Sequence, residues 1–91
     1  MRAPPTLFHL RTADGREVDV LLENRKRELV GVEVKASATV TESDFRGLKL
    51  LQQLVADRLK AGVLLYDGQR LLPFGPRLWA MPLQALWATA D

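Results

Sequence analysis

The feature that most constrains the fold is Ala61–Tyr66, a run that is almost wholly apolar. A strand of this kind is expected to be covered on both faces, and such strands are commonly parallel and reached through a helical crossover. The preceding segment supplies that crossover, because apolar residues recur there at intervals of three and four: Phe45, Leu48, Leu51, Val55 and Leu59. Thr41–Asp44 matches a capping-box pattern with Asp in place of Glu, which predicts a helix beginning there.

Alternating stretches upstream predict three strands. Residues 6–12 and 17–23 alternate and flank Asp14–Gly15, a pair that favours a tight hairpin turn, and residues 30–35 resume the alternation after a polar run. Beyond Tyr66, Asp67–Gly68 predicts a turn into a short strand at Gln69–Phe74, and Pro82 is expected to open a final helical turn through Trp87. The predicted fold is α/β with a mixed sheet: three antiparallel strands, then a helical crossover to a parallel strand, in the order βββαβ.

The amino-acid composition limits the classes of protein to which this chain can belong. The 91 residues suit one domain, and 47% apolar content is typical of a globular chain. The absence of cysteine excludes disulfides, thiolate nucleophiles and sulfur-ligated zinc. No apolar run approaches the roughly 20 residues of a membrane span, so a cytoplasmic protein without a membrane partner is expected. The net charge of +2 is compatible with binding to a polyanion, but it does not by itself indicate such a partner.

The second predicted hairpin brings together the residues that could take part in catalysis or metal binding. A loop centred near Lys26 sets Asp19 opposite Glu33 and Glu17 opposite Lys35, so acids and one lysine share a face. The other face is expected to be the buried one, and it carries Val18, Val20, Leu22, Val30, Val32 and Val34. Neighbouring carboxylates repel unless a cation intervenes, and Mg²⁺ takes oxygen ligands of this kind. These groups suit phosphodiester hydrolysis, with Lys35 orienting a water or stabilising developing charge.

Asp19 followed by Glu33-Val34-Lys35 resembles the D…(D/E)-x-K signature of PD-(D/E)XK nucleases. Further stretches resemble the C-terminal domain of unknown function attached to prokaryotic AAA-type ATPases: residues 11–19, 31–37, 44–48, 62–66 and 73–75. The resemblance implies a restriction-endonuclease-like core, Asp19, Glu33 and Lys35 as catalytic residues, and Asp19, Glu33 and Val34 as ligands of Mg²⁺, with Mn²⁺ as substitute. It further implies DNA as substrate and an ATPase partner. Since few residues precede Phe8, residues 1–91 are expected to form a single nuclease-like domain without the N-terminal helix of the full fold.

Several assignments stay open at this point. Glu17 fits a cross-strand partner of Lys35 as well as a further metal ligand, and Ser37 fits a loop role as well as a phosphate contact. Arg25, Lys26 and Arg27 form a basic tip that either contacts nucleic acid or is only solvated. The site residues themselves fit a solvated, ion-paired sheet face.

Two alternative functions follow. One is a catalytically inactive interaction or regulatory module of the same fold, and the other is a nucleic-acid-binding protein without chemistry. Because aromatic residues collect in the last third of the chain, an exposed apolar patch there would favour a homodimer.

Overall fold

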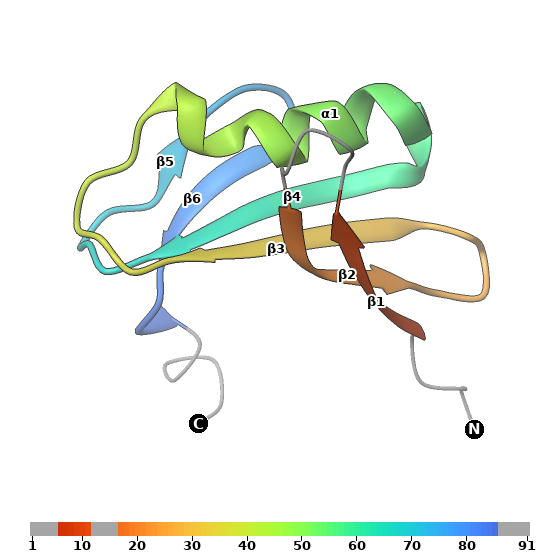
Figure 1. Ribbon diagram of the computed structural model, residues 1–91, viewed down its shortest axis with the longest axis horizontal. Coiled ribbons are helices and arrows are strands. Elements are labelled where there is room, and N and C mark those ends of the chain that lie inside the picture. The colour runs from red at the N-terminus through yellow and green to blue at the C-terminus, as the bar shows by residue number, and fades with distance from the viewer. Residues whose placement is uncertain (1–5, 12–16, 86–91) are drawn as a thin grey trace.

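The protein forms a six-stranded mixed sheet with a helix along one face (Figure 1). The computed structural model describes the backbone of residues 6–11 and 17–85 and the side chains of residues 20–85. The elements in chain order are β1 (Thr6–Arg11), β2 (Glu17–Glu23), β3 (Leu29–Lys35), the 3-10 turn η1 (Glu42–Phe45), α1 (Arg46–Val55), the 3-10 turn η2 (Ala56–Arg58), β4 (Leu59–Tyr66), β5 (Leu72–Pro73) and β6 (Leu78–Pro82). The strand order across the sheet is β1-β2-β3-β4-β6-β5.

The predicted mixed α/β architecture is confirmed. Strands β1, β2 and β3 are antiparallel neighbours, and β4 follows α1 and pairs with β3 in parallel. The β2–β3 hairpin pairs Val20 with Val32 and Glu23 with Leu29, which centres its loop on Lys26 as predicted. The Asn24 side chain closes that loop by accepting hydrogen bonds from the backbone N–H groups of Lys26 (2.9 Å) and Glu28 (3.0 Å).

The second half of the chain departs from the prediction in three places. The helix ends at Val55, and Leu59 begins β4 instead of extending the helical stripe, because Ala56 takes a left-handed backbone with φ 50°. The strand expected at Gln69–Phe74 is reduced to Leu72–Pro73. Pro82 ends the unpredicted strand β6, which pairs with β4 in parallel. A turn follows at residues 83–84 and helical backbone at Ala85, and the rest of the predicted final turn lies outside the described residues. Trp87 and the predicted Asp14–Gly15 turn lie outside the described residues.

The core lies between α1 and the sheet. Phe45 and Leu48 are fully buried there, against Leu59, Leu64 and Leu78 of β4 and β6. Gly62 lets the layers approach, because a Cβ at this position would stand 2.6 Å from Leu78 Cδ2 and 3.4 Å from Leu48 Cδ2. The helix is therefore seated on β4, with β3 and β2 beside it.

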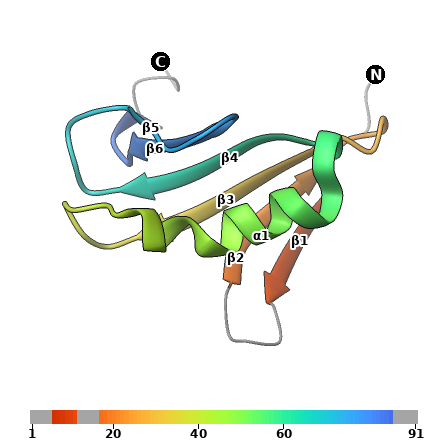
Figure 2. The same cartoon turned by 90° about the horizontal axis from the view of Figure 1, so that it is seen from above.

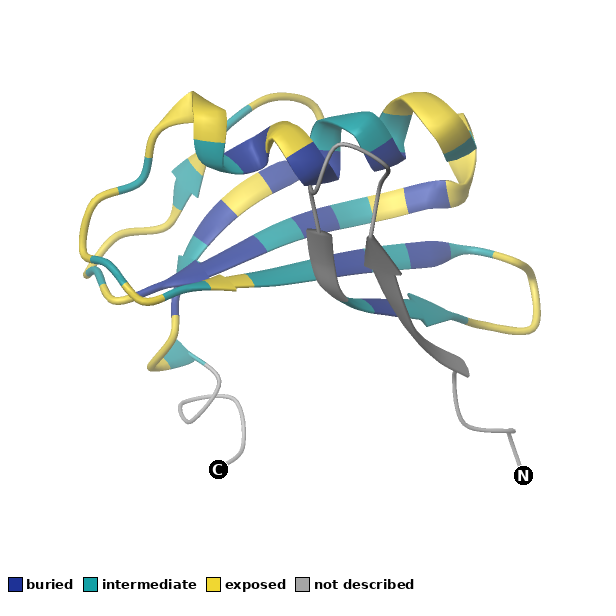
Figure 3. Ribbon diagram, in the orientation of Figure 1, coloured by how far each residue is buried: buried dark blue, intermediate teal, exposed yellow. Residues whose placement is uncertain are grey.

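The prediction of which sheet face is buried was wrong. Leu21 (8% exposed) and Leu29 (3%) belong to the core under α1, whereas Val34 on the alternate face is 51% exposed. Figure 3 shows this alternation along β3. Val20, Leu22, Val30 and Val32 are half-buried, and the side chain of Val18 is outside the described set. The face that carries Glu33 and Lys35 is thus the face that α1 covers, because the crossover packs on Leu21 and Leu29.

The opposite face of the sheet is apolar and bears no helix among the elements from β1 to β6 (Figures 1 and 2). Two rows of side chains cross its three parallel strands, Val32–Val63–Trp79 and Val34–Leu65–Met81. We call these six residues the open face. The apolar run of β4 is largely buried on both faces: Leu64 (1% exposed) lies on the helix side and Leu65 (5%) on the open face, where Val63 is half-buried.

Candidate functional site

The candidate site lies where strands β2 and β3 stop pairing. The described ladder ends at Val20 and Val32, and Asp19 and Glu33 are the next residues on the two strands. Figure 2 shows the β1–β2 hairpin directed away from β3 and β4. Strands that diverge stop exchanging backbone hydrogen bonds with each other, which a ligand site between them would require.

Glu33 faces the covered side of the sheet. It lies beside Leu64 of β4 in the register, and its Oε2 atom is shielded from solvent. Burial disfavours the charged form of a carboxyl group unless hydrogen bonds or a cation compensate. Glu33 is therefore held in an environment where an added cation would have a large electrostatic effect.

Lys35 lies two residues further along the same face and is bound to the start of the helix. Its Nζ donates to Asp44 Oδ2 at 2.5 Å, and the two side chains are 31% and 21% exposed. The same Oδ2 accepts from the backbone N–H of Thr41 (2.8 Å) and from Thr41 Oγ1 (3.2 Å). The predicted capping box at Thr41–Asp44 is confirmed, and the ion pair joins it to the end of β3.

These contacts hold the pKa of Asp44 below its ordinary value. The largest cause is the hydrogen bond from Lys35, followed by the opposing effect of burial and the hydrogen bond from the Thr41 backbone. Asp44 is therefore ionised at neutral pH and keeps the Lys35 ammonium beside it. The sequence predicts Asp44 as a cap residue and leaves Glu17 as either the cross-strand partner of Lys35 or a metal ligand. The capping box was the signal that could have identified the second role of Asp44.

The remaining predicted site residues are distributed as follows. The side chains of Asp19 and Glu17 lie outside the described set. Val34 turns its side chain to the open face, so only its backbone carbonyl could serve a metal. Ser37 Oγ accepts from the backbone N–H of Thr39 (3.1 Å), and its carbonyl accepts from the N–H of Asp67 (2.9 Å). These contacts order the loop after β3, which agrees with the loop role.

Among the side chains that the structure describes, no group of three His, Asp or Glu residues could hold a metal ion. That set includes Glu33 but neither Asp19 nor Glu17. A metal site at this position would therefore depend on Asp19, Glu17 or both.

The basic tip lies at the other end of the hairpin. Arg25 and Lys26 are exposed, while Arg27 Nε donates to Glu23 Oε2 at 3.2 Å. Arg58 Nη2 reaches the same oxygen at 2.7 Å. Strand β3 is seven residues long, so about 20 Å separates the tip from Lys35. The tip and the acids would consequently contact different parts of any common ligand.

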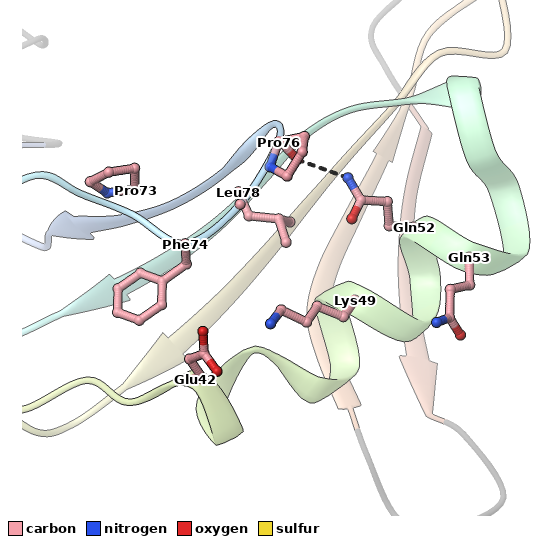
Figure 4. A pocket seen from close by; sticks show the side chains of 9 residues that line it. Glu42, Lys49, Gln52, Gln53, Pro73, Phe74, Pro76 and Leu78 are labelled. Atoms are coloured by element: carbon pink, nitrogen blue, oxygen red, sulfur yellow. Dashed lines mark hydrogen bonds between the residues drawn. The ribbon is translucent and has the colours of Figure 1, made fainter.

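A pocket of about 610 Å³ opens between α1 and the segment that joins β5 to β6 (Figure 4). Glu42, Lys49 and Gln53 form its polar side, and Phe74 and Leu78 belong to its apolar side. Gln52 Nε2 donates to the carbonyl of Pro76 at 2.8 Å and ties the segment to the helix. None of the predicted site residues lines this pocket. The run Pro73-Phe74-Gly75-Pro76 was its only signal in the sequence.

The fold and the site define a small mixed α/β domain whose acid-x-lysine strand ends beside the capped start of a helix. Within the described ranges no helix is long and apolar enough to cross a membrane. The chain belongs to the family described as Domain of unknown function (DUF4143), whose model matches residues 1–86. This family is known as a C-terminal domain of AAA ATPases. Comparisons with curated proteins and with solved structures find no match.

Proposed function

We propose that this domain is a nuclease-like module of the PD-(D/E)XK, restriction-endonuclease-like type that binds Mg²⁺ and acts on the phosphodiester backbone of DNA. The observation that carries the proposal is the end of the β2–β3 ladder. The described β2–β3 register ends at Val20–Val32, so Asp19 and Glu33 are the next residues on these two adjacent strands, and Lys35 follows on the same face as Glu33. Two acids and a lysine at one strand end are the groups that this chemistry requires.

The donor set fits a hard cation. Asp19 and Glu33 would supply carboxylate oxygens and Val34 its carbonyl, and Mg²⁺ is usually bound through one or two carboxylates with several waters retained. Mn²⁺ accepts the same ligands. Bound Mg²⁺ would polarise a phosphoryl oxygen and lower the pKa of a coordinated water.

Lys35 would hold the attacked phosphate in place. An ammonium has three N–H donors, and among the described side chains Asp44 accepts from one of them, so the others could reach a phosphate oxygen or a water. Asp44 positions this ammonium from η1, because the capping box restrains its carboxylate. Lys35 would thus reach a phosphate from a fixed direction, without the entropy cost of ordering a free lysine side chain.

The first experiment measures metal binding by calorimetry. Wild-type protein is titrated with Mg²⁺ and with Mn²⁺, alongside Asp19→Asn and Glu33→Gln. Each substitution is expected to weaken binding by more than about tenfold, because it removes a charged ligand. Asp57→Asn is the matched control, since Asp57 is exposed on η2 and should bind metal like wild type. Wild-type protein that produces no binding heat with either ion would refute the proposal.

The second experiment measures cleavage of supercoiled and linear DNA with Mg²⁺ or Mn²⁺. Lys35→Met is expected to abolish nicking while leaving metal binding near wild type, since Lys35 is not a metal ligand. Lys49→Met is its control, because Lys49 lies on α1 beside the pocket of Figure 4. Equal losses in both variants would show that the charge of Lys35 has no specific role.

A second candidate is favoured by the Lys35–Asp44 ion pair. This pair gives Lys35 a structural task that needs no substrate, as in a catalytically inactive interaction or regulatory module of an AAA-type ATPase. Such a module would bind no metal and cut no DNA. It would instead change the ATPase rate of its partner, and Asp19→Asn would leave that effect intact.

A further inference from the structure

The pocket between α1 and the segment that joins β5 to β6 shares no residue with the proposed cleavage site. Its volume of about 610 Å³ lies within the range of roughly 300–1,000 Å³ that is usual for small-molecule sites. It is open to solvent, because among its nine lining residues only Leu78 is buried. A small molecule can therefore enter it without any rearrangement of the core.

The wall that the β5–β6 segment contributes to this pocket is fixed by hydrogen bonds. The backbone N–H of Phe74 donates to the carbonyl of Leu78 (2.9 Å), and the N–H of Leu78 donates to the carbonyl of Gly75 (3.2 Å). Gln52 Nε2 holds the same turn from the helix through the carbonyl of Pro76 (2.8 Å). A pocket whose walls are already ordered loses little conformational entropy when it binds a ligand.

Phe74 presents an aromatic ring to the pocket (Figure 4). This ring is stacked on Phe45, with the ring centroids 4.5 Å apart and an interplanar angle of 17°. Phe45 is fully buried, so Phe74 is the accessible member of the pair. Aromatic rings attract one another in stacked and edge-to-face arrangements beyond the area that they bury. The wall therefore favours a ligand that carries a flat apolar ring.

Two opposite charges lie on the helix side of the pocket. Glu42 belongs to η1 and Lys49 to α1, and because helical side chains lean toward the N-terminus, Lys49 is directed toward Glu42. Figure 4 shows the Lys49 ammonium turned toward the part of the pocket where Glu42 and Phe74 lie. Among the described side chains no ion pair joins the ammonium to the carboxylate. A ligand in this part of the pocket meets a cation and an anion together.

A ligand with a single kind of charge suits these two groups poorly. An anion is attracted by Lys49 and repelled by Glu42, and for a cation the two effects are reversed. A mononucleotide would bring its phosphate close to the Glu42 carboxylate. A zwitterion, in which an ammonium and a carboxylate are only a few bonds apart, forms a charge-assisted hydrogen bond with each residue.

We propose that this pocket binds a free aromatic α-amino acid. The ring of the ligand packs on Phe74, its carboxylate accepts a hydrogen bond from Lys49, and its ammonium donates one to Glu42. The three groups that the pocket offers are thereby matched by the three groups of one small molecule. The inference does not depend on the proposed function, because the site for Mg²⁺ and DNA contains none of these residues.

The test is a calorimetric titration of the full chain with L-phenylalanine and with three analogues that each lack one group. N-acetyl-phenylalanine lacks the ammonium, phenylalaninamide lacks the carboxylate, and L-alanine lacks the ring. L-phenylalanine is expected to bind saturably. Each analogue should bind about tenfold more weakly or worse, because it loses either a charge-assisted hydrogen bond or the contact with Phe74.

Two substitutions assign each charge of the ligand to its residue. Lys49→Met is expected to weaken the binding of L-phenylalanine about tenfold but not that of phenylalaninamide, which has no carboxylate for Lys49 to bind. Glu42→Gln should weaken L-phenylalanine similarly but not N-acetyl-phenylalanine. Lys60→Met is the matched control, because Lys60 is about half exposed on β4 and lies outside the pocket. Each comparison sets two ligands against one variant, so a change in the stability of that variant does not affect it.

Three results would overturn the proposal. The first is a wild-type chain that produces no binding heat with L-phenylalanine at millimolar concentration. The second is a loss of binding in Lys60→Met equal to that in Lys49→Met, or a phenylalaninamide that binds wild type as tightly as L-phenylalanine does. The third is binding of adenosine monophosphate in preference to L-phenylalanine, which would assign the pocket to a nucleotide.

Discussion

Replacing Asp44 by alanine is expected to lower the free energy of unfolding by about 2 kcal/mol. Loss of the hydrogen bonds to the backbone N–H and side chain of Thr41 uncaps the helix start, which costs about 1 kcal/mol. Loss of the 2.5 Å contact with Lys35 costs about 1 kcal/mol more, because the pair is charged but partly exposed. Lys35→Met keeps the cap and should therefore cost about 1 kcal/mol alone.

The assay is urea unfolding at neutral pH of wild type, Asp44→Ala, Lys35→Met and the double variant. The double-mutant cycle should return a coupling energy of about 0.5–1 kcal/mol. A coupling indistinguishable from zero, or an Asp44→Ala loss below about 0.5 kcal/mol, would show that the ion pair does not join the helix start to β3 energetically.

The same carboxylate predicts a pH dependence with a definite sign. Folding lowers the pKa of Asp44, chiefly through Lys35, so the folded state favours the ionised form. The stabilisation is fully present above about pH 4, where the unfolded chain also ionises, and is lost as the pH falls through the lower folded pKa. The stability difference between wild type and Asp44→Asn should be constant near neutrality and shrink below about pH 4. A difference that grows on acidification contradicts this reasoning.

Three further predictions concern other parts of the fold. Gly62→Ala should lower stability by about 1–3 kcal/mol through its clash with Leu78, and Leu78→Val in that background should recover part of the loss in thermal unfolding. Ala56→Gly should raise stability by about 1 kcal/mol, because φ 50° with ψ −123° is strained for alanine; unchanged denaturant unfolding would refute that strain. Replacing Arg25 and Lys26 by serine should reduce the salt dependence of DNA binding by about one or two counterions, while Arg70→Ser should not.

Local sequence patterns were sufficient to predict much of the candidate site. Alternation and loop position gave the β2–β3 register as far as the Val20–Val32 pair, after which Asp19 and Glu33 follow, and the capping pattern gave the helix start at Thr41. The partner of Lys35 was not predictable from strand pairing. Asp44 reaches it only because the segment after β3 returns across the end of that strand, and this return depends on where α1 packs.

Strand β6 escaped prediction for a related reason. Its five residues show no strong alternation in the sequence, and its pairing with β4 joins segments that are separated by a turn and by β5. Such a short strand is stabilised by the neighbour it pairs with more than by its own composition.

The order of elements from β1 to β4, the hairpin centre at Lys26 and the parallel pairing of β4 with β3 could all be predicted from the sequence, because each follows from periodicity, turn residues or the length of a crossover. Which side of the sheet is covered was not. Leu21 and Leu29 stand on one side and a row of valines on the other, so apolar alternation favoured the valines. The packing of α1 reversed that choice, since the helix approaches the sheet closely where Gly62 leaves room, and the valine side became the open face.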